Sequence, residues 1–251
     1  MAEEEKIREH AKHALQDLTD KNKKWKDRIK DFAWEVFIII VAVNITLWFH
    51  SWSEKRQERE LEKKFLIGTK SDLAIVKQSL KDNIAASQPF LDYANSVLTQ
   101  IEEHRIDKAF VDTNSYNLTT YIPFFYDNSR FENFKSSGYL RLIENDSLSM
   151  FITGLYTVTF PRELSFDNVQ TDIATRNFYT FIGSKVQIDF SSGRMILSNL
   201  LNSSDVQLLI FLRISSLNMR KLQKQARIEE IEGVISKIDR ELKTRFNYQE
   251  K

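Results

Sequence analysis

Residues 32–52 read FAWEVFIIIVAVNITLWFHSW, and this stretch decides how the rest of the chain is organised. Its apolar part, residues 32–49, spans about 27 Å as an α-helix, which matches the hydrocarbon thickness of a bilayer. The centre, residues 36–43, has no polar side chain, whereas the core helix of a soluble protein normally keeps one polar face. The stretch therefore predicts a single transmembrane helix.

The tryptophans support this prediction, because all 4 of them lie in or near the stretch. Indole rings prefer the headgroup level, so Trp34 on one side and Trp48 and Trp52 on the other indicate two interfacial belts. A cleaved signal peptide is the alternative. It would require a small-x-small cleavage site, and the apolar run ends in bulky side chains instead. We therefore expect the helix to remain as an anchor in the lipid bilayer.

Two polar positions inside the predicted span have alternative interpretations. Glu35 is either a functional membrane acid or a side chain at headgroup depth that reaches water, and its place near the edge favours the second. Asn44 either hydrogen-bonds a neighbouring helix and holds a complex together, or is tolerated beside Thr46, whose hydroxyl would bond its own backbone.

The charges around the span give a slight bias in orientation. Six basic residues lie within residues 21–30 and five within 55–64, so the positive-inside rule favours a cytoplasmic N-terminus. We expect a charged cytoplasmic tail (1–31), a transmembrane helix (32–52) and an extracytoplasmic helical domain (53–251). About 200 residues are enough for one sizeable domain.

Composition excludes several function classes. The formal net charge is +1, from 36 basic and 35 acidic side chains, which argues against a nucleic-acid-binding surface. The chain has no cysteine; His10 and His13 alone make a weak metal signal. The motifs of zinc proteases, serine hydrolases, phosphate loops and dinucleotide sites do not occur. We therefore expect a protein that is not an enzyme and has no cofactor.

The predicted helices follow the anchor directly. Residues 53–64, SEKRQERELEKK, have the alternating charges of an exposed helix. Leu66, Leu73 and Leu80 then recur every seven residues, which predicts a coiled-coil or bundle seam. Pro89 indicates a kink or a new start, with Ser87 as the candidate cap.

The C-terminal part predicts a second long helix from about Ser204. Its apolar seam keeps a heptad phase that Lys221 and Lys224 interrupt, and it is long enough to run back along the first helix. The expected fold class is all-α, with one N-terminal transmembrane helix continuing into an elongated bundle of long antiparallel helices.

The intervening region predicts shorter elements. Gly138 suits the end of a short helix, and Asn145 or Asp146 suits the N-cap of another that Pro161 would stop. Ser165 is the candidate cap of a further helix, and residues 186–190 alternate as in a short strand.

An aromatic stretch, residues 107–127, has poor periodicity and predicts a loop. Its aromatic side chains either line a ligand groove or pack the loop onto the helices, and packing is the commoner outcome. These residues are Tyr116, Tyr121, Phe124, Phe125 and Tyr126.

Two stretches carry a resemblance to a known family. One is the anchor exit, where Glu35 opens the span and Trp52-Ser53-Glu54-Lys55-Arg56 follows it; the other is Phe134-Lys135-Ser136-Ser137-Gly138 followed by Leu142-Ile143, Asn145, Leu148 and Tyr156. The chain resembles an uncharacterised family of single-span envelope proteins from Gram-negative bacteria, a domain of unknown function, but departs from it in its long charged tail. The resemblance implies an anchored helical domain and supplies no catalytic residue.

Three functional hypotheses remain open at this point. The first is a bitopic interaction protein that scaffolds an envelope complex or self-associates, with a protein partner or a second copy as its ligand. The second is a ligand sensor that uses the aromatic stretch as its pocket. The third is an accessory subunit of an ion-driven membrane machine that uses Glu35.

Overall fold

The computed structural model describes residues 8–12 and 25–248, without the side chains of residues 25–28 and 181. This part of the chain is predominantly helical, and its strands form one two-stranded sheet. The chain divides into two compact units, Met1–Leu61 and Glu62–Lys251. The prediction of a mainly helical protein with a long apolar helix near the N-terminus is confirmed.

The long helix α2 (Trp25–Glu102) supplies most of the first unit and the first element of the second. In the first unit, large apolar side chains of α2 are exposed. Phe37 is 54% exposed, Ile40 53% and Leu47 59%. An 18-residue window here has a mean hydropathy of 2.0 and no buried residue. By length and composition, this helix can cross a membrane.

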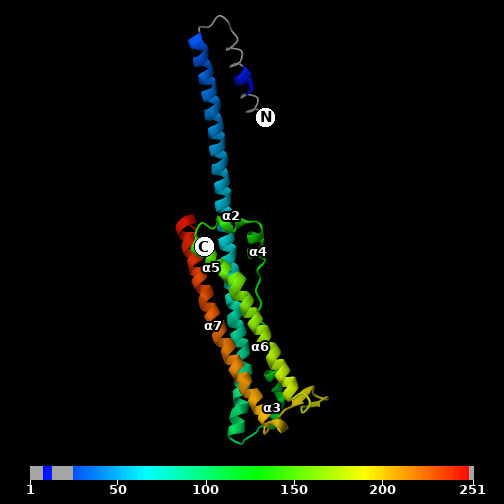
Figure 1. Ribbon diagram of the computed structural model, residues 1–251. Helices are drawn as coiled ribbons and strands as arrows, with labels where there is room; N and C mark the ends of the chain where they lie inside the picture. Colours follow the sequence, from blue (N-terminus) through cyan, green and yellow to red (C-terminus); the bar gives the residue numbers. More distant parts are fainter. Residues whose placement is uncertain (1–7, 13–24, 249–251) are drawn as a thin grey trace. The chain divides into compact units, whose positions relative to one another are not determined.

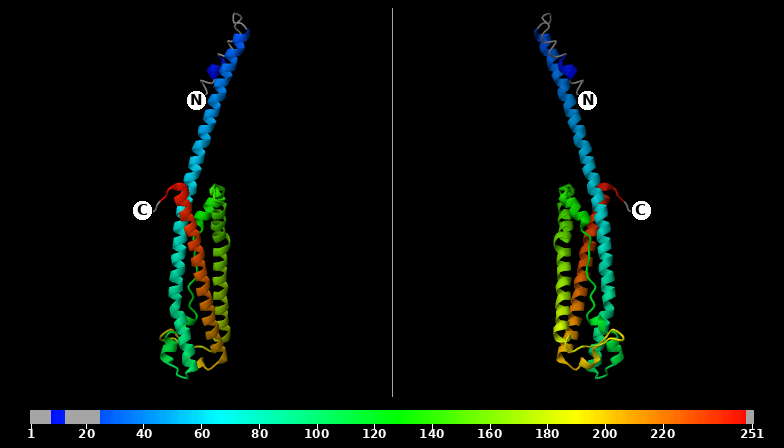
Figure 2. Two further views of the ribbon diagram at one scale, coloured as in Figure 1. Left: turned by 90° about the vertical axis from the view of Figure 1, so that its left-hand side faces the viewer. Right: turned by 90° about the vertical axis from the view of Figure 1, so that its right-hand side faces the viewer.

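The second unit is a helical bundle. The later part of α2 lies beside α6 (Phe160–Phe181) and α7 (Ser204–Phe246) in Figure 1 and in both views of Figure 2. Ion pairs link α2 to α7 at successive levels: Glu62 to Arg245 at 2.7 Å, Lys70 to Asp239 at 2.7 Å, and Lys77 to Glu232 at 3.4 Å.

Short elements connect α2 to α6. They are α3 (Lys108–Thr113), the 3-10 turn η1 (Ser115–Leu118), α4 (Ser129–Ser136), the 3-10 turn η2 (Tyr139–Leu142), α5 (Asp146–Gly154) and the π-helical turn η3 (Leu155–Thr159). The Asn145 side chain accepts a hydrogen bond from the Leu148 N–H, so the predicted cap is confirmed. Gly138 has a φ of 73°, a conformation that glycine adopts without strain.

Pro89 does not interrupt α2, contrary to the sequence-based expectation. Pro89 and Ala85, the residue whose carbonyl loses an N–H partner, are both exposed, so that carbonyl lies on the solvent side of the helix. Ser87 is not a cap, because its hydroxyl donates back to the Asn83 carbonyl within the same helix.

Pro161 does not stop a helix either. It lies in the first turn of α6, directly after the π-helical turn η3, and the helical run continues through it. The π-helical turn η3 joins α5 directly to α6, so Ser165 is inside a helix rather than at a cap. The extra residue of a π-turn changes the helix phase, and sequence periodicity does not reveal such a change.

A small hairpin separates α6 from α7. Strands β1 (Gln187–Asp189) and β2 (Arg194–Ile196) pair antiparallel, and the turn η4 (Ser198–Leu200) follows. The predicted extended piece is confirmed, and so is the start of α7 at Ser204.

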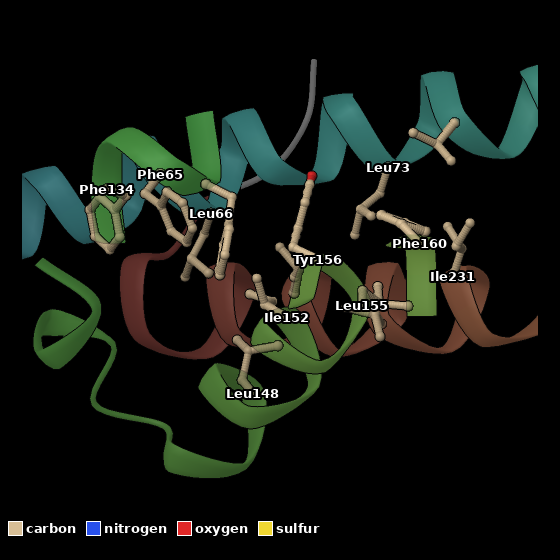
Figure 3. Close-up of a cluster of buried hydrophobic side chains, with 14 of the residues drawn as sticks. Phe65, Leu66, Leu73, Phe134, Leu148, Ile152, Leu155, Tyr156, Phe160 and Ile231 are labelled. Atoms are coloured by element: carbon tan, nitrogen blue, oxygen red, sulfur yellow. The ribbon is translucent and has the colours of Figure 1, made fainter. Parts of the chain in front are cut away.

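The core of the bundle consists of two apolar clusters. The first, drawn in Figure 3, joins α2, the α4–α5 region and the C-terminal half of α7, and it includes a stacked Phe65–Phe134 pair with centroids 3.8 Å apart. The second surrounds Tyr93, Val97 and Ile210. Each fully buried large apolar side chain contributes about 1.5–3 kcal/mol. Between the two clusters, the buried residues of α7 include charged side chains.

Candidate functional site

The buried face of α7 changes chemistry part-way along the helix. Its core positions are spaced alternately by three and four residues, and from Ile210 they run through Arg213, Leu217, Arg220 and Lys224 before apolar residues resume at Ile231. The three cations are only 4%, 6% and 2% exposed, respectively. Long cationic side chains are almost never this buried unless they are paired.

Asp167 of α6 is the main partner of these cations. Its Oδ1 lies 2.9 Å from Arg220 Nη2 and 3.0 Å from Lys224 Nζ, and the side chain is 2% exposed. Asp167 Oδ2 also accepts the Phe124 N–H at 3.0 Å. One carboxylate thus holds two helices and the segment that passes between them.

Glu163 lies one turn before Asp167 on α6. Its Oε1 is 3.8 Å from Lys224 Nζ, a distance at the outer limit of an ion pair. Burial raises the pKa of the Glu163 carboxyl, and the neighbouring Lys224 only partly opposes this rise. Glu163 is therefore the less well compensated of the two acids.

The segment 117–123 is bound by side chains from two long helices. Asn83 of α2 donates to the carbonyls of Ile122 and Pro123, at 3.2 and 3.1 Å. Arg220 donates to the Ile122 carbonyl at 3.3 Å. Because residues 119–123 belong to no helix or strand, these side chains supply the donors that the carbonyls of Ile122 and Pro123 need.

Arg213 is held differently from the other two cations. Its Nη2 donates to the carbonyls of Asn117 and Thr120, and its guanidinium lies 4.0 Å from the Tyr121 ring centroid. In the part of the chain that the structure describes, no carboxylate lies within ion-pair distance of Arg213. Burial lowers the pKa of its guanidinium.

Two cavities adjoin the charged cluster. A small one between α2 and α7 has about 20 Å³ of room, enough for about one water, and Asn83, Arg220 and Lys224 line it. A larger, half-open cleft of about 270 Å³ lies between α6 and α7, with Arg213 and Tyr121 among its lining residues. The cluster thus combines buried charge with accessible space.

The five aromatic residues proposed from the sequence do not converge on one groove. Phe124 is buried in the first apolar cluster, and Tyr126 packs against it at a centroid distance of 5.8 Å. Tyr116 and Phe125 are exposed. Tyr121 alone lines the two cavities.

The anchor residues proposed from the sequence lie on the apolar helix of the first unit. Trp34, Trp48 and Trp52 are exposed, and Glu35 is half-buried. Asn44 donates to the Ile40 carbonyl at 2.7 Å. Thr46 likewise donates to the Ala42 carbonyl, so both polar groups bond within their own helix.

The histidine pair offers no structural support for a metal site. His10 is exposed, and His13 lies outside the described residues. Among the residues that are described, no group of three His, Cys, Asp or Glu side chains could hold a metal ion.

The sequence analysis did not predict the charged cluster. Two signals were present. Arg213, Leu217 and Arg220 are spaced by four and three residues, so the two arginines lie on the same helix face as a core leucine. Glu163 and Asp167 are four residues apart, so the two acids also share one helix face.

No family model, curated protein or solved structure matches this chain. The likeness to an envelope-protein family therefore stays a prediction.

Proposed function

We propose that this chain is a non-enzymatic, single-pass membrane protein whose helical domain is a scaffold or accessory subunit of an envelope complex. A row of exposed apolar side chains on α7 carries the proposal. Leu208, Leu212, Met219 and Leu222 are spaced by four, seven and three residues, which is a helical repeat, with Phe211 beside them, and all are 40–64% exposed. An apolar surface of this kind is typical of a protein-binding face.

This row, the α7 stripe, is separate from the core-facing positions of the same helix. Since α7 already buries one seam in the bundle, the α7 stripe is a second apolar face that stays largely exposed in the described part of the chain. Val169 and Ile173 of α6 are also about half exposed, and Ile173 lines the same cleft as Leu212 and Met219. The apolar surface therefore extends from α7 onto α6.

The remaining parts of the proposal rest on length, composition and pairing. The apolar helix of the first unit is long enough to serve as an inner-membrane anchor. The basic residues before it support a cytoplasmic N-terminus and a periplasmic domain. The ion pairs between α2 and α7 support two long antiparallel helices in that domain.

The test is co-purification of the full chain at native expression. A C-terminal tag, extraction in a mild detergent, light scattering and mass spectrometry would identify a stoichiometric partner or a second copy. The variant Phe211→Ser with Leu222→Ser removes two large side chains of the α7 stripe, and we expect it to lose that partner. Neither residue lines a cavity described above.

Phe190→Ser is the matched control, since Phe190 is 90% exposed but lies in the hairpin region, away from α7 in sequence. It should retain the partner. Recovery of the unmodified chain alone, as a monomer, would contradict the proposal, and so would retention of the partner by the double variant.

A further inference from the structure

The buried charges of the second unit do not balance. Arg213, Arg220 and Lys224 are three buried cations, whereas Glu163 and Asp167 are the two carboxylates that face them. Asp167 is engaged by Arg220 and Lys224, and Glu163 by Lys224 alone. The excess positive charge therefore belongs to Arg213. A buried charge without a counter-ion is costly, and an anion placed beside it is favoured.

The hydrogen bonding of Arg213 is also incomplete. Its Nη2 donates to two backbone carbonyls, but Nε and Nη1 are buried and have no acceptor among the described residues. The ring of Tyr121 lies against the guanidinium. Guanidinium N–H groups left without acceptors are strong donors toward an oxyanion.

The cleft of about 270 Å³ adjoins this side chain. Besides Arg213, its walls are mainly apolar, with Ile173 from α6 and Leu209, Leu212 and Met219 from α7. A few polar groups join them, among them Ser216, whose hydroxyl donates to Gln170 Oε1 at 3.2 Å. Small-molecule sites typically combine such apolar walls with one or two fixed polar groups.

We propose that the α6–α7 cleft binds a small amphipathic anion: a single carboxylate on an unbranched apolar body, with its headgroup at Arg213. The charge of Arg213 selects an anionic headgroup, because Arg213 is the one cation among the described residues that line the cleft. The apolar walls select the body. The cleft volume is just below the usual range of small-molecule sites, roughly 300–1,000 Å³, which favours a medium-length chain.

The test is photolabelling of the full chain in membranes with decanoate that carries a terminal diazirine. Proteolysis and mass spectrometry then locate the adducts. We expect labelling of the α6 and α7 peptides that line the cleft. The matched probe is the corresponding decanol, which has the same body and no charge, and it should label these peptides about tenfold less, the effect of losing one charge-assisted hydrogen bond.

Variants of the chain separate the charge from the cleft. Arg213→Gln should reduce labelling by decanoate to the level of the alcohol. Arg176→Gln is its matched control, since Arg176 pairs with Asp172 on an exposed face of α6, and it should leave labelling unchanged. Met219→Asp places a negative charge in the cleft lining and should also reduce labelling. Its control is Asn218→Asp, at an exposed α7 position outside the cleft lining and outside the α7 stripe.

Two results would overturn the proposal. One is equal labelling of the cleft by the acid and the alcohol, which would mean that the charge of Arg213 has no part in binding. The other is labelling confined to the predicted membrane span, residues 32–52, which would mean that the probe only dissolves in the bilayer.

Discussion

The two halves of α7 have the same spacing and nearly the same burial, yet they pack by different chemistry. In the C-terminal half, Ile231, Val234, Ile238 and Leu242 occupy the core positions. In the N-terminal half, Arg213, Arg220 and Lys224 occupy equivalent positions with exposures below 7%. Seam position alone therefore does not determine whether a residue of this helix is apolar.

The difference has a structural consequence. An apolar side chain requires only a space of suitable volume, and many neighbours can supply it. A buried cation requires an acceptor at a particular point. Arg220 and Lys224 reach Asp167, and Arg213 reaches the carbonyls of residues 117 and 120. We infer that the charged half fixes the register of α6 and of the segment 117–123 against α7.

The largest effect is expected from Asp167→Ala. Arg220 and Lys224 would lose their shared carboxylate while remaining buried, and breaking a buried ion pair costs about 3–5 kcal/mol. Urea unfolding of the full chain in a mild detergent, followed by circular dichroism, measures this loss. Asp172→Ala removes a carboxylate that is about half exposed and pairs with Arg176, and it should cost less than about 1 kcal/mol. If the two variants lost similar amounts of unfolding free energy, burial of the ion pair would not explain the contribution of Asp167 to stability.

The apolar half is tested by Ile238→Ala. Ile238 is fully buried, so removing its side-chain carbons leaves a cavity and should cost about 2–5 kcal/mol. Ile238→Val, which removes one methylene, should cost only about 0.5–1.5 kcal/mol. The graded series identifies loss of packing. If the valine variant lost as much stability as the alanine variant, packing volume would not explain the role of this half.

The features that the sequence predicts well are local ones. The apolar run of residues 32–49, the Asn145 cap and the start of α7 at Ser204 each depend on residues within a few positions of one another. Lys221 and Lys224 appeared as interruptions of a heptad. Lys224 instead continues the buried seam, because Asp167 lies 57 positions away in the chain and 3.0 Å away in space.

The features that the sequence did not predict depend on how distant elements meet. Whether Asp167 can pair with Arg220 depends on which face α6 turns toward α7. The π-helical turn η3 shifts that face, and sequence composition does not reveal the shift. The aromatic stretch is similar: its residues alternate between core, cavity and solvent, so Phe124 and Phe125 are neighbours in sequence with opposite exposure.

The smallest effect concerns Glu163, the acid whose pKa is raised by burial above its ordinary value of 4.5. Between that value and the raised one, the folded chain keeps a proton that the unfolded chain has released. The stabilisation from this group is therefore present at low pH and lost as pH rises through the folded pKa. Glu163→Gln lacks this dependence.

The stability of Glu163→Gln relative to the unmodified chain should therefore increase from pH 4.5 to pH 7. The slope for one proton is at most about 1.4 kcal/mol per pH unit. Thermal unfolding at a series of pH values measures it. Glu229→Gln, at an exposed position of α7, is the control and should follow the unmodified chain at every pH. A Glu163→Gln curve parallel to the unmodified one would mean that the charge of Lys224 fully offsets the burial of Glu163.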